Sequence, residues 1–261
     1  MTNSEELLYE IKDGIGRITF NRPEARNAFK FQMYERLREI CEHAGNDSSV
    51  KVLVMTGAGG KAFAAGTDVT QFKAFSTGDD VMAYEARIER VLGAIESCPV
   101  PTIAAISGAC TGGGFTIAGC CDLRIGAANA RFGVPISRTL GNCLSMSNYL
   151  RLVSLLGLAR AKDIIFTARL MDAEEALKIG LLGEILPDYE SLQRRATELA
   201  ETVASNAPLT LRTTKEALRR IKEKMNPGED RDLILSCYMS DDFREGMDAF
   251  LNKRPPKWTG K

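Results

Sequence analysis

The stretch that decides the fold is residues 102–118, TIAAISGACTGGGFTIA, where a short apolar run leads into three consecutive glycines and a second apolar segment. This order is typical of a buried strand, a tight turn and a helix. A segment of the same design lies upstream at residues 51–72, KVLVMTGAGGKAFAAGTDVTQF. Because the strand–loop–helix unit recurs, stacking of such units into a superhelix is one arrangement that the sequence allows.

The two glycine loops, residues 62–69 and 108–116, each come immediately before a predicted helix. Their small side chains leave the main chain bare, and the first N–H groups of a helix have no partner inside it. Donors of this kind that converge from two loops form a site for a developing oxyanion. The glycines have neither the Gly-x-Gly-x-x-Gly spacing of a dinucleotide site nor the Gly-Lys-Ser/Thr ending of a P-loop. The remaining alternative to an oxyanion site is that the glycines only allow a helix to pack tightly on a strand.

Strands and helices alternate in the first half of the chain, and helical patterns fill the second half. A hairpin is predicted at residues 7–20, with Asp13 and Gly14 at its turn, and a mixed α/β core extends to about residue 135. The segments expected to be helices are residues 29–43, 81–96, 158–167, 173–180, 189–205, 208–224 and 241–250, and the further expected strands are residues 50–55 and 102–106.

Composition excludes several classes of function. The 261 residues carry 34 Lys plus Arg and 34 Asp plus Glu, and the resulting zero net charge disfavours broad binding to nucleic acid or to anionic membranes. A single histidine, His43, cannot supply a site that needs several histidine ligands. Seven scattered cysteines without a Cys-x-x-Cys pair favour buried free thiols in a reducing compartment. The acidic, polar first residues differ from a signal peptide, so we expect a cytoplasmic protein without a metal site.

Several motifs occur in order from Leu8 to the end of the chain. They are AFAAGTD at residues 62–68, PTIAAISG at 101–108, TGGG at 111–114, CDLR at 121–124, FGVP at 132–135, LGLARA at 156–161, APLTLRTTKEAL at 207–218, SDDFREG at 240–246 and KRPP at 253–256. With these motifs the sequence resembles the enoyl-CoA hydratase/isomerase (crotonase) superfamily.

The resemblance implies an α/β fold, a crotonase-like spiral of ββα repeats with a C-terminal helical trimerisation region. Residues 1–200 would form the spiral with its acyl-CoA pocket, and residues 201–261 the C-terminal helices and tail. It also implies a homotrimer or a dimer of trimers. The implied substrate is an acyl-CoA thioester, in which coenzyme A is part of the substrate and no separate cofactor is needed.

The same resemblance assigns residues to the site. The thioester oxygen would lie between the backbone N–H groups of Thr67 and Gly113. Arg26 would contact the nucleotide phosphates, and Phe250, Trp258 and Lys261 would cover the nucleotide. The alternatives are that Arg26 and Lys261 are solvated charges and that Trp258 is a packing residue. The other residues expected at substrate or coenzyme A are Ala28, Ala64, Ala65, Gly66, Asp68 and Val69, together with Ser137 and Arg138 of a segment that departs from the family pattern. For Asp68 a helix cap is the favoured interpretation. Arg138 would either bind a carboxylate of the acyl group or brace the trimer or a neighbouring loop.

The chain departs from the family pattern at the two positions where hydratases carry glutamates. Thr116 stands at the first and Ile136 or Ser137 at the second. A threonine hydroxyl cannot act as a general acid or base near neutral pH, because its pKa is far too high. Glu89, on the predicted helix 81–96, is our hypothesis for the base; Glu85 lies one turn away on the same face, and a surface ion pair is the alternative for Glu89.

Three kinds of function follow. The first is an enzyme of the enoyl-CoA hydratase/isomerase type, a lyase or isomerase that stabilises a thioester enolate. The second is a homologue that binds acyl-CoA without catalysis. The third is a decarboxylase or thioester hydrolase of the crotonase type. Cys143 as a nucleophile is disfavoured, because no histidine lies near it in sequence.

Overall fold

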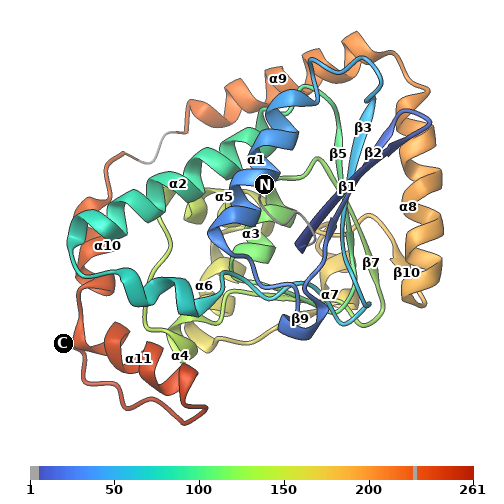
Figure 1. Ribbon diagram of the computed structural model, residues 1–261. Helices are drawn as coiled ribbons and strands as arrows, with labels where there is room; N and C mark the ends of the chain where they lie inside the picture. The colour runs from blue at the N-terminus through green and yellow to red at the C-terminus, as the bar shows by residue number, and fades with distance from the viewer. Residues whose placement is uncertain (1–5, 226–227) are drawn as a thin grey trace.

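Two β-sheets form the centre of the computed structural model, which describes residues 6–225 and 228–261 (Figure 1). The larger sheet has the strand order β1-β2-β3-β5-β7-β10 and the smaller one β4-β6-β8-β9. Neighbouring strands are parallel except for the pairs β1–β2 and β8–β9. The strands are β1 (Leu7–Lys12), β2 (Ile15–Phe20), β3 (Val52–Gly57), β4 (Ala62–Ala64), β5 (Thr102–Ile106), β6 (Ala109–Thr111), β7 (Leu123–Ala127), β8 (Arg131–Gly133), β9 (Met171–Asp172) and β10 (Ile185–Leu186).

The chain alternates between these sheets, which confirms the predicted spiral of ββα repeats. Each turn places one strand in the larger sheet and the next in the smaller sheet, and then enters a helix. The turns are β3–β4–α2, β5–β6–α3 and β7–β8–α4, where α2 spans Gly78–Glu96, α3 spans Gly113–Cys120 and α4 spans Ile136–Thr139. Equivalent glycine loops from successive turns therefore lie side by side, because β4 and β6 are hydrogen-bonded neighbours.

Helices cover both faces of the larger sheet. One face packs against α8 through Leu192, Ala196 and Ala200, and the other faces α1, α2 and α3 (Figure 1). The remaining helices are α1 (Phe31–His43), α5 (Met146–Leu156), α6 (Leu158–Thr167), α7 (Ala173–Lys178), α8 (Tyr189–Ala204), α9 (Pro208–Glu223), α10 (Arg231–Tyr238) and α11 (Asp241–Leu251), with 3-10 turns η2 (Pro23–Ala25) and η3 (Val69–Ala74).

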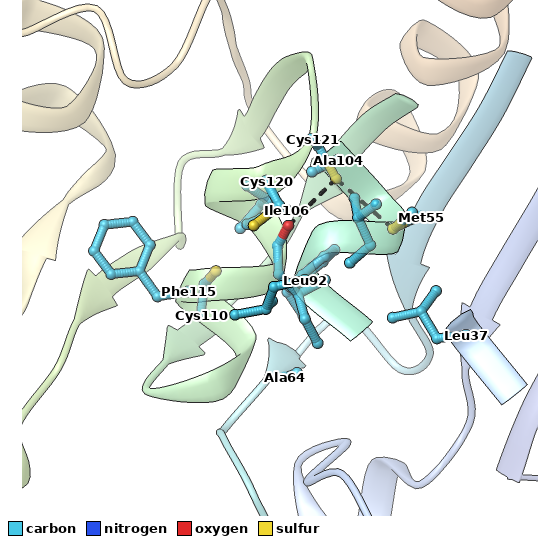
Figure 2. Packing of buried hydrophobic residues seen from close by; sticks show 14 of the residues in the cluster. Leu37, Met55, Ala64, Leu92, Ala104, Ile106, Cys110, Phe115, Cys120 and Cys121 are labelled. Atoms are coloured by element: carbon cyan, nitrogen blue, oxygen red, sulfur yellow. Dashed lines mark hydrogen bonds between the residues drawn. The ribbon is translucent and has the colours of Figure 1, made fainter. Parts of the chain in front are cut away.

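The cysteines take part in this packing as free thiols. Figure 2 shows Cys110, Cys120 and Cys121 among apolar side chains such as Met55 and Leu92. Burial raises the pKa of the Cys121 thiol to about 12, so it stays protonated at physiological pH. All seven cysteines are free, and the described residues contain no cluster of three or more His, Cys, Asp or Glu that could hold a metal ion.

Most predicted helices form near their expected bounds. The helix predicted at residues 81–96 begins earlier, at Gly78, because Thr77 and Asp80 form a reciprocal capping box before it. The strand predicted at residues 50–55 forms instead at Val52–Gly57, in register with β2. The prediction missed the strands of two or three residues and helices α4, α5 and α10.

The C-terminal region packs onto the spiral. Helix α10 lies against α2, and α11 lies against α4 and η3. The tail after α11 folds back, so that the Asp242 carboxylate accepts hydrogen bonds from the backbone N–H groups of Thr259 (2.6 Å) and Gly260 (2.9 Å). Within residues 6–225 and 228–261, every helix is too short or too polar to span a membrane.

Candidate active site

A pocket of about 550 Å³ opens where the two glycine loops meet α2, α4 and the C-terminal helices, a volume in the range of small-molecule sites. Of the residues predicted to bind substrate, Arg26, Ala28, Ala65, Gly66, Thr67, Asp68, Val69, Gly113 and Phe250 line the pocket. Tyr238 and Phe250 come from the C-terminal region, so the pocket is built from both predicted parts of the chain rather than from residues 1–200 alone.

The two glycine loops approach each other through their main chains. A Cβ atom on Gly114 would lie 2.1 Å from the Ala64 carbonyl oxygen, so only glycine allows this approach. Gly66 has a φ of +102°, which turns the chain just before Thr67. On either side of Thr67, the Phe29 N–H donates to the Gly66 carbonyl (2.8 Å) and the Asp68 N–H donates to the Phe29 carbonyl (2.9 Å).

The amides of Thr67 and Gly113 are left without an acceptor in the part of the chain that the structure describes. They are close to each other, because a Cβ atom placed on Gly113 would lie 3.6 Å from the Thr67 nitrogen. Gly113 is the first residue of α3, where the helix dipole is positive. Two unpaired donors therefore meet at the pocket wall, as an oxyanion site requires.

A row of hydroxyl groups supports the Thr67 loop. The Thr67 Oγ1 atom is hydrogen-bonded to the Tyr34 hydroxyl (2.9 Å) and to the Tyr84 hydroxyl (3.1 Å). Burial raises the pKa of Tyr34 to about 12 and also raises that of Tyr84, so both phenols stay neutral. The row holds Thr67 in place and brings α2, which carries Tyr84, next to the two amides.

The positions to which the family resemblance assigns two glutamates hold no acid here. The Thr116 hydroxyl donates to the Gly113 carbonyl (2.9 Å), and Ile136 is buried in the pocket wall. Ser137 donates its hydroxyl to the Ile165 carbonyl, and Arg138 is exposed; neither side chain lines the pocket, so the structure does not place Arg138 to bind an acyl carboxylate.

Glu85 is the pocket carboxyl that the sequence analysis did not select. Its side chain is buried, and Oε1 accepts a hydrogen bond of 2.8 Å from the Tyr238 hydroxyl. Burial raises the pKa of Glu85 to about 7, although the bond from Tyr238 acts in the opposite direction. Asp68 also lines the pocket, and in the described chain these are its two carboxyl groups. A carboxyl with a pKa near 7 can both accept and release a proton at neutral pH.

The structure places Glu89, our hypothesis for the base, in an ion pair outside the pocket. Both Glu89 oxygens accept hydrogen bonds from the Arg151 guanidinium, at 2.6 and 2.7 Å, and the side chain lies outside the pocket. The alternative interpretation, an ion pair, is confirmed. The sequence did contain a signal for Glu85: it continues the buried stripe of Val81, Ile88 and Leu92 at helical spacing, where a carboxylate stands out among apolar residues.

Asp68 acts as a cap. Its carboxylate accepts from the Thr70 N–H (3.2 Å) and hydroxyl (2.7 Å) and pairs with Arg22 (3.1 Å). Burial acts to raise the pKa of Asp68, but the bonds from Thr70 and Arg22 outweigh it and the pKa is lowered. Asp68 therefore stays ionised and bound, as the favoured interpretation from sequence predicted.

The remaining predicted contacts lie around the mouth of the pocket or away from it. Arg26 is exposed at the mouth, and its carbonyl accepts from the Ala65 N–H (3.0 Å). Ala64 is buried in β4. Trp258 lies beside Gly141. The main-chain oxygen of Lys261 accepts from the Asp241 N–H (2.8 Å).

Cys143 lines the pocket beside Cys237. Burial is the main reason that the pKa of the Cys143 thiol is raised, and the neighbouring Cys237 raises it further. A thiol that resists ionisation is a poor nucleophile, which agrees with the low expectation from the sequence.

Alternating strands in two sheets and a pocket between two glycine loops define a protein of the crotonase fold. The sequence model of the enoyl-CoA hydratase/isomerase family matches residues 10–261, and the chain belongs to this family, whose members act on acyl-CoA thioesters.

Named relatives and solved structures agree with this assignment. The chain is 34% identical to a short-chain-enoyl-CoA hydratase of Clostridium acetobutylicum, with 95% of each chain covered. It is 32% identical to a crotonyl-CoA hydratase of Syntrophomonas wolfei, with 98% of this chain and 99% of the relative covered. The crystal structure of an enoyl-CoA hydratase from Bacillus anthracis superimposes with a TM-score of 0.77 at 30% identity, covering 98% of this chain and 100% of that one.

Proposed function

We propose that the protein moves a double bond along the acyl chain of an enoyl-CoA, with Glu85 as the single proton carrier and the amides of Thr67 and Gly113 as the oxyanion site. The observation that carries the proposal is a buried carboxyl, Glu85, in the same pocket as two unpaired amides, and its burial raises its pKa to about 7. Tyr84, which precedes Glu85 on α2, bonds to Thr67 Oγ1, so the carboxyl and the amides belong to one connected wall.

The chemistry follows from these groups. The Glu85 carboxylate takes a proton from the carbon next to the thioester carbonyl of a 3-enoyl-CoA, and the electron pair moves onto the carbonyl oxygen to give a dienolate. Each amide stabilises the negative charge that develops on the carbonyl oxygen by about 3 kcal/mol. The protonated Glu85 then returns the proton to the far end of the dienolate and yields the 2-enoyl-CoA. One carboxyl is enough, because the group that takes a proton in the first step can return a proton in the second, after exchange with solvent.

Hydration is the less favoured reaction for this pocket. By the family resemblance it uses two carboxylates, and here Thr116 and Ile136 occupy their positions. Neither side chain can activate a water molecule near neutral pH. The relatives that are named hydratases therefore share the fold and the acyl-CoA substrate class with this protein, while the reaction we propose is isomerisation.

The experiment compares Glu85→Gln with Glu89→Gln, two carboxyls one turn apart on α2. Purified variants are incubated with 3-enoyl-CoA and 2-enoyl-CoA thioesters in heavy water, and products and deuterium content are followed by mass spectrometry. We expect Glu85→Gln to lose isomerisation and exchange by at least about 10³-fold, and Glu89→Gln to stay near wild type. Unchanged turnover in Glu85→Gln overturns the proposal.

The same assay separates the other functions. Release of free coenzyme A or of carbon dioxide by the wild type would identify a hydrolase or a decarboxylase. Tight binding of every thioester with neither exchange nor turnover would identify a non-catalytic acyl-CoA binder. A hydroxyacyl-CoA product without isomerisation would identify a hydratase. Each of these results overturns the proposed reaction.

We also propose that the chain assembles as a homotrimer or a dimer of trimers. Leu218 and Ile221, three residues apart on one side of α9, are exposed apolar side chains, and α9 has no buried residue in the described chain. Such a face favours association. Sedimentation equilibrium would give the mass, and a monomer at micromolar concentration would contradict the proposal.

A further inference from the structure

Three side chains from distant parts of the sequence form a hydrogen-bonded chain at the inner wall of the pocket. The Asn142 Nδ2 group donates to the Tyr238 hydroxyl (3.0 Å), and this hydroxyl donates to Glu85 Oε1 (2.8 Å). An amide NH₂ can only donate, so the Tyr238 oxygen accepts from Asn142 and its one proton points to Glu85. The chain is therefore ordered in one direction.

We infer that Tyr238 is a positioning residue that sets the proton affinity of Glu85, and that Asn142 holds the Tyr238 hydroxyl in its donating orientation. The inference rests on the proposed role of Glu85 as the proton carrier. Neither residue lies in a motif of the family resemblance, and Tyr238 follows Glu85 by 153 residues.

The hydrogen bond from Tyr238 is the one contact in the described chain that favours the Glu85 carboxylate, because no described Lys or Arg forms an ion pair with it. The titratable groups that act on it or face it are Tyr34 of α1, Tyr84 and Glu89 of α2, Cys143, and Asp230 and Tyr238 at α10. Of these, Tyr238 donates a hydrogen bond to the carboxyl. The carboxylates of Asp230 and Glu89 act in the opposite direction and disfavour a second negative charge.

An unpaired atom shows how the chain serves both protonation states. The Oδ1 atom of Asn142 is buried and has no hydrogen-bond partner in the described residues. When Glu85 holds a proton, its carboxyl becomes a donor and the Tyr238 oxygen accepts it. The Tyr238 proton must then turn away, and a flipped Asn142 amide presents Oδ1 to receive it. The protons of Tyr238 and Glu85 therefore have an acceptor in both states, which suits a group that takes up and releases a proton in each turnover.

The size of the effect follows from the bond to be removed. Tyr238→Phe deletes the donor to the carboxylate and keeps the ring, which packs against Phe243 at 4.9 Å between centroids. A hydrogen bond to a charged group corresponds to a shift of about one to two pKa units. The pKa of Glu85 should therefore rise by about one unit or more. The acidic limb of the profile of kcat/KM against pH moves up by the same amount.

The experiment measures this shift directly and kinetically. The Glu85 carboxyl is titrated by ¹³C NMR in protein labelled at glutamate, with Glu85→Gln identifying its signal, and kcat/KM is recorded from pH 5 to 10. For Tyr238→Phe we expect about a tenfold loss at pH 6 and near wild-type activity at pH 9.5. Asn142→Leu should give a smaller upward shift. Tyr149→Phe, which removes a nearby hydroxyl that does not contact Glu85, should give none.

The outcomes are separable. A pKa of Glu85 that stays within about 0.3 unit of wild type in Tyr238→Phe, or that falls, overturns the inference. If Tyr238→Phe does not fold, Asn142→Leu decides in the same way. If Glu85→Gln keeps full activity while the titration shifts as expected, the proposed function fails and the hydrogen-bond relation stands.

Discussion

Replacing Gly113 by alanine should abolish catalysis while leaving the fold in place. Gly113 has an ordinary φ, so its backbone accepts alanine. The added methyl carbon would lie 3.6 Å from the Thr67 nitrogen and 2.3 Å from the Tyr34 hydroxyl oxygen. Tyr34 is almost fully buried and packs on Phe29 with ring centroids 4.8 Å apart, so it has little room to withdraw.

The substitution should lower both catalytic activity and stability, for different reasons. The methyl group and the displaced Tyr34 occupy the space where an oxygen would have to lie about 2.9 Å from each amide nitrogen. Loss of one such donor costs about 10²–10³ in kcat, and here both amides are obstructed. We therefore expect kcat/KM to fall by at least about 10³. Overpacking at Tyr34 should lower the free energy of unfolding by about 1–3 kcal/mol.

Gly93→Ala is the matched control. Gly93 lies inside α2, and a Cβ atom there meets no other atom within 4 Å. This variant should keep wild-type activity and gain about 1 kcal/mol of stability from better helix propensity. The assay is deuterium exchange into a bound acyl-CoA, with affinity for free coenzyme A measured by calorimetry and folding by circular dichroism. A folded Gly113→Ala variant that exchanges within tenfold of wild type would refute the oxyanion assignment.

Two further predictions concern stability. Burial raises the pKa of Glu85 from an ordinary 4.5 to about 7, so the folded chain binds this proton more tightly than the unfolded chain does. The contribution of Glu85 to the free energy of unfolding therefore falls by about 3 kcal/mol as the pH rises from about 4.5 to 7. Urea titrations at pH 5 and pH 8 should show Glu85→Gln gaining stability over wild type at pH 8, and an equal difference at both values would contradict the shift. The buried Arg151 bonds to Glu89, Glu96 and Asn148, so Arg151→Met should cost about 3–5 kcal/mol in the same titrations. A cost below about 1 kcal/mol would show that the network is dispensable.

The parts of the fold that local patterns determine could be predicted. Residues 102–106 form a strand and residues 158–167 a helix as expected, because an apolar run or a helical stripe specifies each by itself. The strand at Ala62–Ala64 could not be predicted, because three residues carry no periodicity and pair only after the spiral has closed.

The site also has parts that the local sequence determines and parts that it does not. The positions of the two glycine loops follow from residues that are adjacent in sequence, whereas the choice between Glu85 and Glu89 depends on how α2 is rotated against α10 and α5. Glu89 meets Arg151 of α5, and Glu85 meets Tyr238 of α10. Long-range pairs of this kind have no local signal, apart from the apolar stripe on which Glu85 lies.

Because Glu85 is translated before Tyr238, the hydrogen bond between them forms late in the synthesis of the nascent chain. The 153 residues that separate them take about 8–30 s to translate at ordinary ribosomal speed. During that interval both glycine loops and Glu85 have been made, but the hydroxyl that favours ionisation of Glu85 has not. A nascent chain that has already folded its spiral would carry Glu85 without its hydroxyl partner and without the cover of α10, so the pocket reaches its final form only once α10 has docked.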